Sequence, residues 1–176
     1  AASGTNSAFC ADIATTSHNE LQSPSIPIPA GTEYVRVELD ETHNNELDIE
    51  RKGWDGALMR ILLGGTRYFS GSAGNMTPFY PWQMNRSSAA ENPLHDLSCW
   101  SGDTTPNFAH YATDFLDMGG QTIQVLLGMS TDSAIGTATG QFIDNVVVTA
   151  IDYQCECTDP PTAAGPTPAP FDRVSV

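Results

Sequence analysis

Apolar and polar residues alternate in several short segments of the chain. In EYVRVELD (33–40), Val35, Val37 and Leu39 alternate with polar neighbours, and QTIQVLLGMS (121–130) repeats the pattern. A period of two places successive side chains on opposite faces of a strand. GALMRILLGGTRYF (56–69) has two apolar runs around Gly64-Gly65, which is typical of a β-hairpin. Helical periodicity is nearly absent, so we expect an all-β sandwich.

Two further segments predict positions within the sheets. FIDNVVVTAIDY (142–153) is apolar on both faces, which favours a central strand. LQSPSIPIPAG (21–31) contains Pro24, Pro27 and Pro29. Because proline has no N–H for a strand ladder, these residues belong at a sheet edge.

The rest of the chain is less regular. No clear strand is visible between Ser70 and Ala112, and a loop of this length is usually functional or tied by a disulfide. After Cys157 the composition changes to TDPPTAAGPTPAP, typical of an extended proline-rich linker. We therefore predict a sandwich at 1–157, a linker at 158–170 and a candidate docking strand, FDRVSV, at 171–176.

Charge narrows the choice of partners. The 176 residues suffice for one well-buried domain, and 21 acidic against 7 basic residues give a formal charge of −14. Such a surface repels nucleic-acid phosphates and anionic membranes, and it attracts divalent cations. No run reaches the ~20 apolar residues that a membrane helix needs. We expect neither nucleic-acid binding nor membrane insertion.

Four cysteines, Cys10, Cys99, Cys155 and Cys157, occur without a CxxC motif. This favours disulfides over zinc, redox or haem chemistry. Cys155 and Cys157 are too close in sequence to bridge each other without strain. We expect Cys10 and Cys99 each to pair with one of them, in preference to a Cys10–Cys99 bond, and which pairs with which stays open. Disulfides and a first residue other than Met predict a secreted protein, extracellular or at the cell surface.

Several segments in a fixed order resemble a known family: ELQSPSIPIPAG, DIERKGWDGALMRI, SCWSGD and the stretch from DFLDMGGQ to GQFIDNVVV. The chain is similar, from Glu20 to Ala150, to the noncatalytic jelly-roll (MAM-like) domains of secreted bacterial proteases of the immune-inhibitor-A type and of related surface proteins. The resemblance implies an antiparallel two-sheet jelly roll whose terminal strands lie close together. It also implies an accessory role in adhesion, substrate recognition or assembly.

Jelly-roll domains often hold a structural calcium ion where a loop carboxylate meets the last strand, which directs attention to NNELDIERKGWDG (44–56). Calcium takes six to eight oxygen ligands, and this segment offers Asp48, Glu50 and Asp55. Asp144 interrupts the apolar last strand, and a buried carboxylate needs a partner, so we expect it to join them. The alternative is that Asp144 caps a bulge or accepts backbone N–H bonds, while Asp55-Gly56 is simply a turn. Asp132, in TDSAIGTATG (131–140), is a further candidate, although a hairpin loop is favoured there.

Aromatic residues gather in the long loop region. Tyr80, Trp82 and Trp100 could stack on sugars or anchor a protein interface. The alternative, which the pattern favours, is a local core that stabilises the loop.

Motifs for catalysis are missing from the sequence. It contains no HExxH, no GxSxG and no phosphate-binding glycine loop, and its histidines lack zinc-binding spacing. Carboxylate pairs such as Asp40 and Glu41 arise by chance among so many acids. We therefore expect a non-enzyme.

The leading prediction is a noncatalytic, calcium-stabilised extracellular module that recognises a protein or glycan surface. The alternative is a structural subunit of an extracellular filament. In that case the alternating residues of 171–176 would add a strand to a sheet edge of the next copy.

Overall fold

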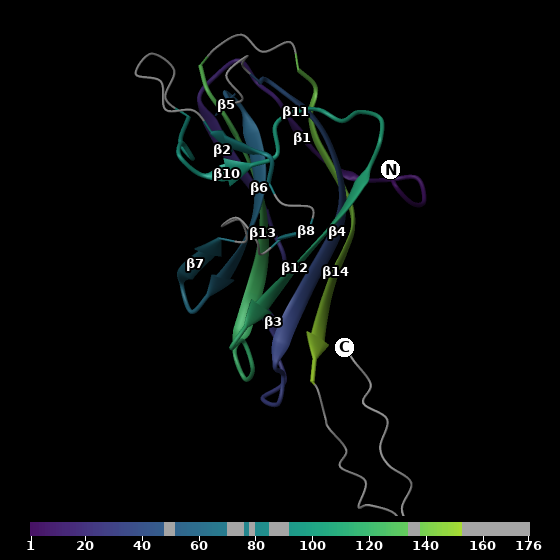
Figure 1. Cartoon of the computed structure of the whole chain (residues 1–176), viewed down its shortest axis with the longest axis vertical. Helices are drawn as coiled ribbons and strands as arrows, with labels where there is room; N and C mark the ends of the chain where they lie inside the picture. The colour runs from purple at the N-terminus through teal and green to yellow at the C-terminus, as the bar shows by residue number, and fades with distance from the viewer. Residues whose placement is uncertain (48–51, 70–75, 78–79, 85–91, 134–137, 153–176) are drawn as a thin grey trace, which may run out of the picture.

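A computed structural model describes residues 1–47, 52–69, 76–77, 80–84, 92–133 and 138–152. These residues contain fourteen strands and no helix, and the sheets pack together as the predicted all-β sandwich (Figure 1). In particular, no helix of the described part is long and apolar enough to cross a membrane.

The larger sheet has six strands. They are β1 (Ala8–Ala11), β4 (Tyr34–Asn45), β8 (Met76–Thr77), β11 (Gly102–Asp103), β12 (Ala109–Leu116) and β14 (Gly140–Ile151). Their order is β1-β14-β4-β12-β8, and β11 also pairs with β4. The first and last strands, β1 and β14, are antiparallel neighbours, an arrangement that the resemblance implies.

The second sheet has five strands. They are β2 (Ser17–Gln22), β3 (Ile26–Pro27), β6 (Gly56–Leu63), β7 (Thr66–Phe69) and β13 (Thr122–Thr131). Their order is β2-β13-β6-β7, and β3 also pairs with β13, so the proline-bearing segment lies at the edge as predicted. The hairpin between β6 and β7 is confirmed. Gly64 and Gly65 form its turn at φ +51° and +83°, values that favour glycine.

A third, small sheet corrects the prediction for the long loop. It has the order β10-β9-β5, formed by β5 (Lys52–Gly53), β9 (Trp82–Met84) and β10 (Ser98–Cys99). Four strands, β8 to β11, and part of β12 lie between Ser70 and Ala112. Strands of two or three residues are too short to display a period of two, so the sequence pattern did not reveal them.

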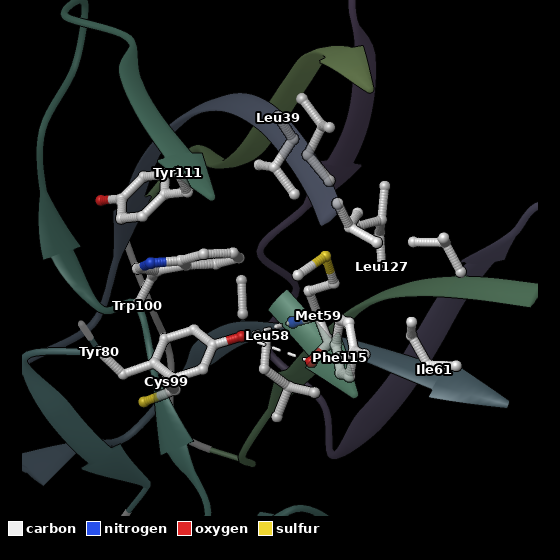
Figure 2. Packing of buried hydrophobic residues seen from close by; sticks show 14 of the residues in the cluster. Leu39, Leu58, Met59, Ile61, Tyr80, Cys99, Trp100, Tyr111, Phe115 and Leu127 are labelled. Carbon is white, nitrogen blue, oxygen red and sulfur yellow. Dashed lines mark hydrogen bonds between the residues drawn. The ribbon is translucent and has the colours of Figure 1, made fainter. Parts of the chain in front are cut away.

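The core fills the space between the two larger sheets. Val35, Val37 and Leu39 of β4 are fully buried, as their alternation predicts. Figure 2 shows how aromatic rings extend this core. The Trp100 ring lies 4.7 Å, centroid to centroid, from the ring of Tyr80 and 4.7 Å from that of Tyr111.

The last strand, β14, has neighbours on both sides, β1 and β4, which confirms its predicted interior position. Its outer face is nevertheless open. Val146 and Val147 are 43% and 49% exposed. Apolar residues on both faces therefore indicated its place in the sheet but not burial of both faces.

Candidate metal centre

Four carboxylates meet at one end of the sandwich, and we call them the acidic cluster. Asp12 directly follows β1, Glu46 follows β4, Asp55 precedes β6 and Asp132 follows β13. Two of the strands belong to the larger sheet and two to the second sheet. The cluster therefore spans the gap between the sheets.

The acidic cluster is compact, and two of its four members are buried while Asp12 and Glu46 are partly buried. One carboxylate oxygen from each of Glu46, Asp55 and Asp132 lies within 4.8 Å of the others. Asp55 and Asp132 are each 1% exposed, and the backbone N–H of Asp132 donates to Asp55 Oδ1 at 2.7 Å. Oε2 of Glu46 is buried and has no hydrogen-bond partner among the described residues. Asp12 interacts with the Asp55 side chain and with the backbone of Glu46.

Burial raises the pKa of Asp55 to about 8, and repulsion from Asp12 and Asp132 adds to the shift. Burial also raises the pKa of Asp12 and of Glu46, again with repulsion from Asp132. A protonated Asp55 can donate a hydrogen bond to Asp12. Without a bound cation, the cluster thus keeps a proton where most carboxyl groups have lost theirs.

The geometry and chemistry of the acidic cluster fit calcium. Calcium–oxygen distances are about 2.3–2.6 Å, so two ligands on opposite sides of one ion lie about 5 Å apart. The 4.8 Å limit on the oxygen separations is within that span. The grouped ligands are all carboxylates, without the histidine or cysteine that zinc prefers.

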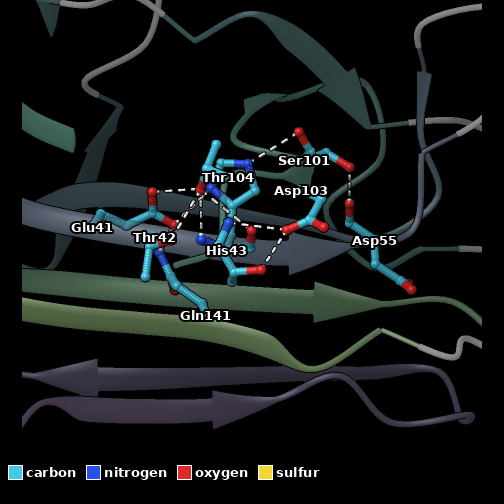
Figure 3. A network of polar contacts seen from close by, with 9 residues as sticks. Glu41, Thr42, His43, Asp55, Ser101, Asp103, Thr104 and Gln141 are labelled. Atoms are coloured by element: carbon cyan, nitrogen blue, oxygen red, sulfur yellow. Dashed lines mark hydrogen bonds and ion pairs between the residues drawn. The ribbon is translucent and has the colours of Figure 1, made fainter. Parts of the chain in front are cut away.

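A second polar cluster adjoins the first, and we call it the His43 network (Figure 3). His43 Nδ1 lies 3.0 Å from each carboxylate oxygen of Glu41, and Nε2 lies 3.1 Å from the Ser101 carbonyl oxygen. Gln141 Nε2 donates to Glu41 Oε1 at 3.3 Å. Because the carbonyl can only accept, Nε2 must carry a hydrogen. A second proton must then lie between Nδ1 and Glu41, so the two side chains share it.

Of the predicted metal ligands, the structure places only Asp55 in the acidic cluster. Asp48 and Glu50 lie outside the described residues. The cluster also contains Asp132, which the sequence analysis raised as a candidate but favoured as part of a hairpin loop. Asp12 and Glu46 were missed, because nothing marks them among 21 acidic residues until the strand ends are brought together.

Asp144 lies apart from the acidic cluster, which corrects its predicted role. It is four positions into β14, or about 13 Å from the start of the strand. Its carboxylate accepts the backbone N–H of Ser3 at 2.9 Å and that of Asn145 at 2.8 Å. These bonds, led by the one from Ser3, lower the pKa of Asp144. The register shifts between Asp144 and Val147, and Asn145 has φ +50°, so the alternative of a carboxylate at a bulge describes this residue.

The predicted aromatic ligand residues are mostly part of the core. Trp100 is fully buried and Tyr80 is 8% exposed. The Tyr80 hydroxyl accepts the backbone N–H of Met59 at 2.8 Å. Trp82 is half-buried against the same core. Neither Tyr80 nor Trp100 presents a ring for stacking on a sugar, since both fill the space beneath the short strands of the loop.

Cys10 and Cys99 are free thiols in the structure. Their predicted disulfide pairing stays a prediction, because it involves two cysteines that the structure does not describe. Cys99 is fully buried in β10, and burial raises its pKa to about 12. Cys155 and Cys157 lie outside the described residues.

A cavity of about 210 Å³ opens between β1 and β2, the edge strands of the two larger sheets. Its lining includes Phe9, Cys10, Leu21 and Leu127. Phe9 and Leu21 are each 53% exposed at this opening. Within the described strands, β1 pairs only with β14 and β2 only with β13, so one edge of each strand is open.

No known protein family and no curated protein matches the chain. Function therefore has to be argued from the site itself.

Proposed function

We propose that this protein is a noncatalytic, calcium-stabilised β-sandwich module that acts outside the cell in recognition or adhesion. The observation that carries the calcium proposal is the acidic cluster, in which carboxylate oxygens of Glu46, Asp55 and Asp132 lie within 4.8 Å of one another and Oε2 of Glu46 has no hydrogen-bond partner among the described residues. Isolated buried charges are costly, and a divalent cation removes that cost by coordinating them.

A bound calcium ion would link the two sheets. Asp12 and Glu46 extend the larger sheet, whereas Asp55 and Asp132 belong to the second one. Without a cation the carboxylates repel one another, which disfavours the close approach of these strand ends. With a bound ion each carboxylate would be attracted to the metal, so the strand ends would be held together. The metal would thus stabilise the folded state without taking part in a reaction.

Calorimetric unfolding in calcium and in EDTA tests this proposal, together with metal analysis of the purified protein. Calcium at 100 times its dissociation constant adds about 2.7 kcal/mol to the free energy of unfolding, which for a domain of this size raises Tm by about 5–10 °C. Asp132→Asn should abolish the increase. Asp144→Asn, which removes a carboxylate outside the cluster, should retain it. An equal Tm in calcium and EDTA, with no bound metal, would refute the proposal.

The filament remains the second candidate, because the open edges of β1 and β2 flank an apolar cavity. An extended segment of another copy can add to such an edge and place alternate side chains into the cavity. Light-scattering mass should be compared, in calcium, between the full chain and one that ends at Thr158. Assemblies that become monomers on truncation would support the filament. Monomers in both cases would exclude assembly through the tail and favour the recognition module.

A further inference from the structure

We propose that Ser101 is a positioning residue for the metal centre, because its buried hydroxyl holds the backbone on which two of the carboxylates sit. The inference rests on the proposed calcium site and adds the part of the chain that shapes it.

Ser101 bridges two segments that are distant from it in sequence. Its hydroxyl lies 2.7 Å from the carbonyl oxygen of Asp55 and 3.0 Å from that of Glu46, and its single proton is shared between them. The carbonyl of Glu46 also accepts the backbone N–H groups of Trp54 and Asp55, at 3.1 and 3.3 Å. The backbone carbonyls of two acidic-cluster residues, Glu46 and Asp55, therefore both contact the same hydroxyl group.

The backbone of Ser101 is itself fixed by a hydrogen bond from the His43 network. Its carbonyl oxygen accepts a hydrogen bond from His43, whose ring is fixed by Glu41 (Figure 3). His43 is 2% exposed, Glu41 is fully buried and Ser101 is 2% exposed. A Cβ atom at Gly53 would approach the Ser101 hydroxyl to 2.8 Å, so the chain is closely packed on this side too. The hydroxyl has little freedom to move.

This arrangement matters because ligand oxygens must converge within a few tenths of an ångström to coordinate one ion. Groups that orient metal ligands without touching the metal typically contribute 10–100-fold to metal affinity. Without the hydroxyl, the carbonyls of Glu46 and Asp55 lose a common donor, and their side chains are no longer held at a set separation.

The test compares Ser101→Ala with Ser130→Ala by isothermal titration with calcium chloride, starting from metal-free protein. Ser130 is a matched control, since it is fully buried and its hydroxyl also donates to a backbone carbonyl, that of Ser17, at 3.0 Å. We expect the calcium dissociation constant to rise 10–100-fold in Ser101→Ala and to stay within about twofold of wild type in Ser130→Ala. Tm in EDTA should fall by similar amounts in both variants.

Two results would overturn the positioning role while the calcium site stands: an unchanged calcium affinity in Ser101→Ala, or an equal loss of affinity in both serine variants. A wild-type protein that binds no calcium would instead refute the proposed function and this inference with it. Far-UV circular dichroism in EDTA checks that each variant is folded. If Ser101→Ala is destabilised, the dependence of its Tm on calcium concentration supplies the affinity.

Discussion

The acidic cluster and the His43 network lie at the same end of the sandwich and share Ser101 as a neighbour, yet their charges are arranged in opposite ways. In the His43 network, Glu41 faces an imidazole that shares a proton with it, and an amide donates to the same carboxylate. In the acidic cluster, carboxylates face carboxylates. The first is balanced by the protein itself, and the second has to take up a proton or a cation.

The difference shows that burial alone does not identify a binding site. Both groups contain side chains that are almost completely buried. The two groups differ in whether the chain itself supplies an opposite charge and hydrogen-bond donors to the buried carboxylates. A buried polar group that the chain already satisfies contributes to folding, whereas one that it leaves unsatisfied indicates a ligand.

The largest effect is expected from breaking the His43 network. His43→Leu leaves the Glu41 carboxylate fully buried without its main partner, so the free energy of unfolding should fall by about 3–5 kcal/mol. Guanidinium denaturation should show most of this loss in EDTA as well as in calcium, because this pair is balanced without metal. A smaller additional loss in calcium would come from the weaker hold on Ser101. The double variant Glu41→Leu/His43→Leu should recover much of the loss. A loss confined to calcium-containing buffer would mean that the two clusters are not distinct.

Asp55→Asn should change the free energy of unfolding by a smaller amount, and the change should be positive in EDTA and negative in calcium. In EDTA the variant should be more stable than wild type at pH 8, because one repelling carboxylate has gone while Oδ1 can still accept the N–H of Asp132. In calcium it should lose the stabilisation of about 2.7 kcal/mol that the wild type gains at 100 times the dissociation constant. Urea denaturation in both buffers measures the two effects. A variant destabilised equally in both would contradict a repulsive metal-free cluster.

The stability of the metal-free protein should also depend on pH through Asp55. The pKa of Asp55 is raised in the folded state to about 8 from an ordinary value of 3.8, so the folded state binds the proton more tightly than the unfolded state does. The stability from this group is therefore present at low pH and is lost as pH rises towards 8. Tm in EDTA, measured from pH 5 to pH 8, should fall more steeply for wild type than for Asp55→Asn. Parallel profiles would exclude Asp55 as the source.

The smallest effect concerns the thiols near the two clusters. Cys10 is half-buried and two residues before Asp12, so calcium that holds Asp12 should slow its alkylation by iodoacetamide several-fold. Cys99 is fully buried, with its pKa raised to about 12, and should stay unmodified in both conditions. Mass spectrometry of tryptic peptides separates the two sites. A Cys10 rate that calcium does not change would remove Asp12 from the metal centre.

Local patterns in the sequence predicted much of the framework. The alternation at Val35, Val37 and Leu39 identified β4, and Gly64-Gly65 identified the hairpin between β6 and β7. Among the predicted metal ligands that the structure describes, only Asp55 lies in the acidic cluster, while Asp144 lies at a bulge. A search for carboxylates within one loop could not have found the cluster, because its members come from four different strand ends.

The sequence by itself determined the all-β class, the strand faces and the edge position of the prolines, because side-chain period and backbone chemistry act over a few neighbouring residues. Only the tertiary structure decided which charges meet. Asp12 and Asp132 are distant in sequence and become neighbours because β1 and β13 end at the same end of the packed sheets. Glu41 and Asp55 are both buried acids, and the packing alone gives one a histidine and the other two aspartates.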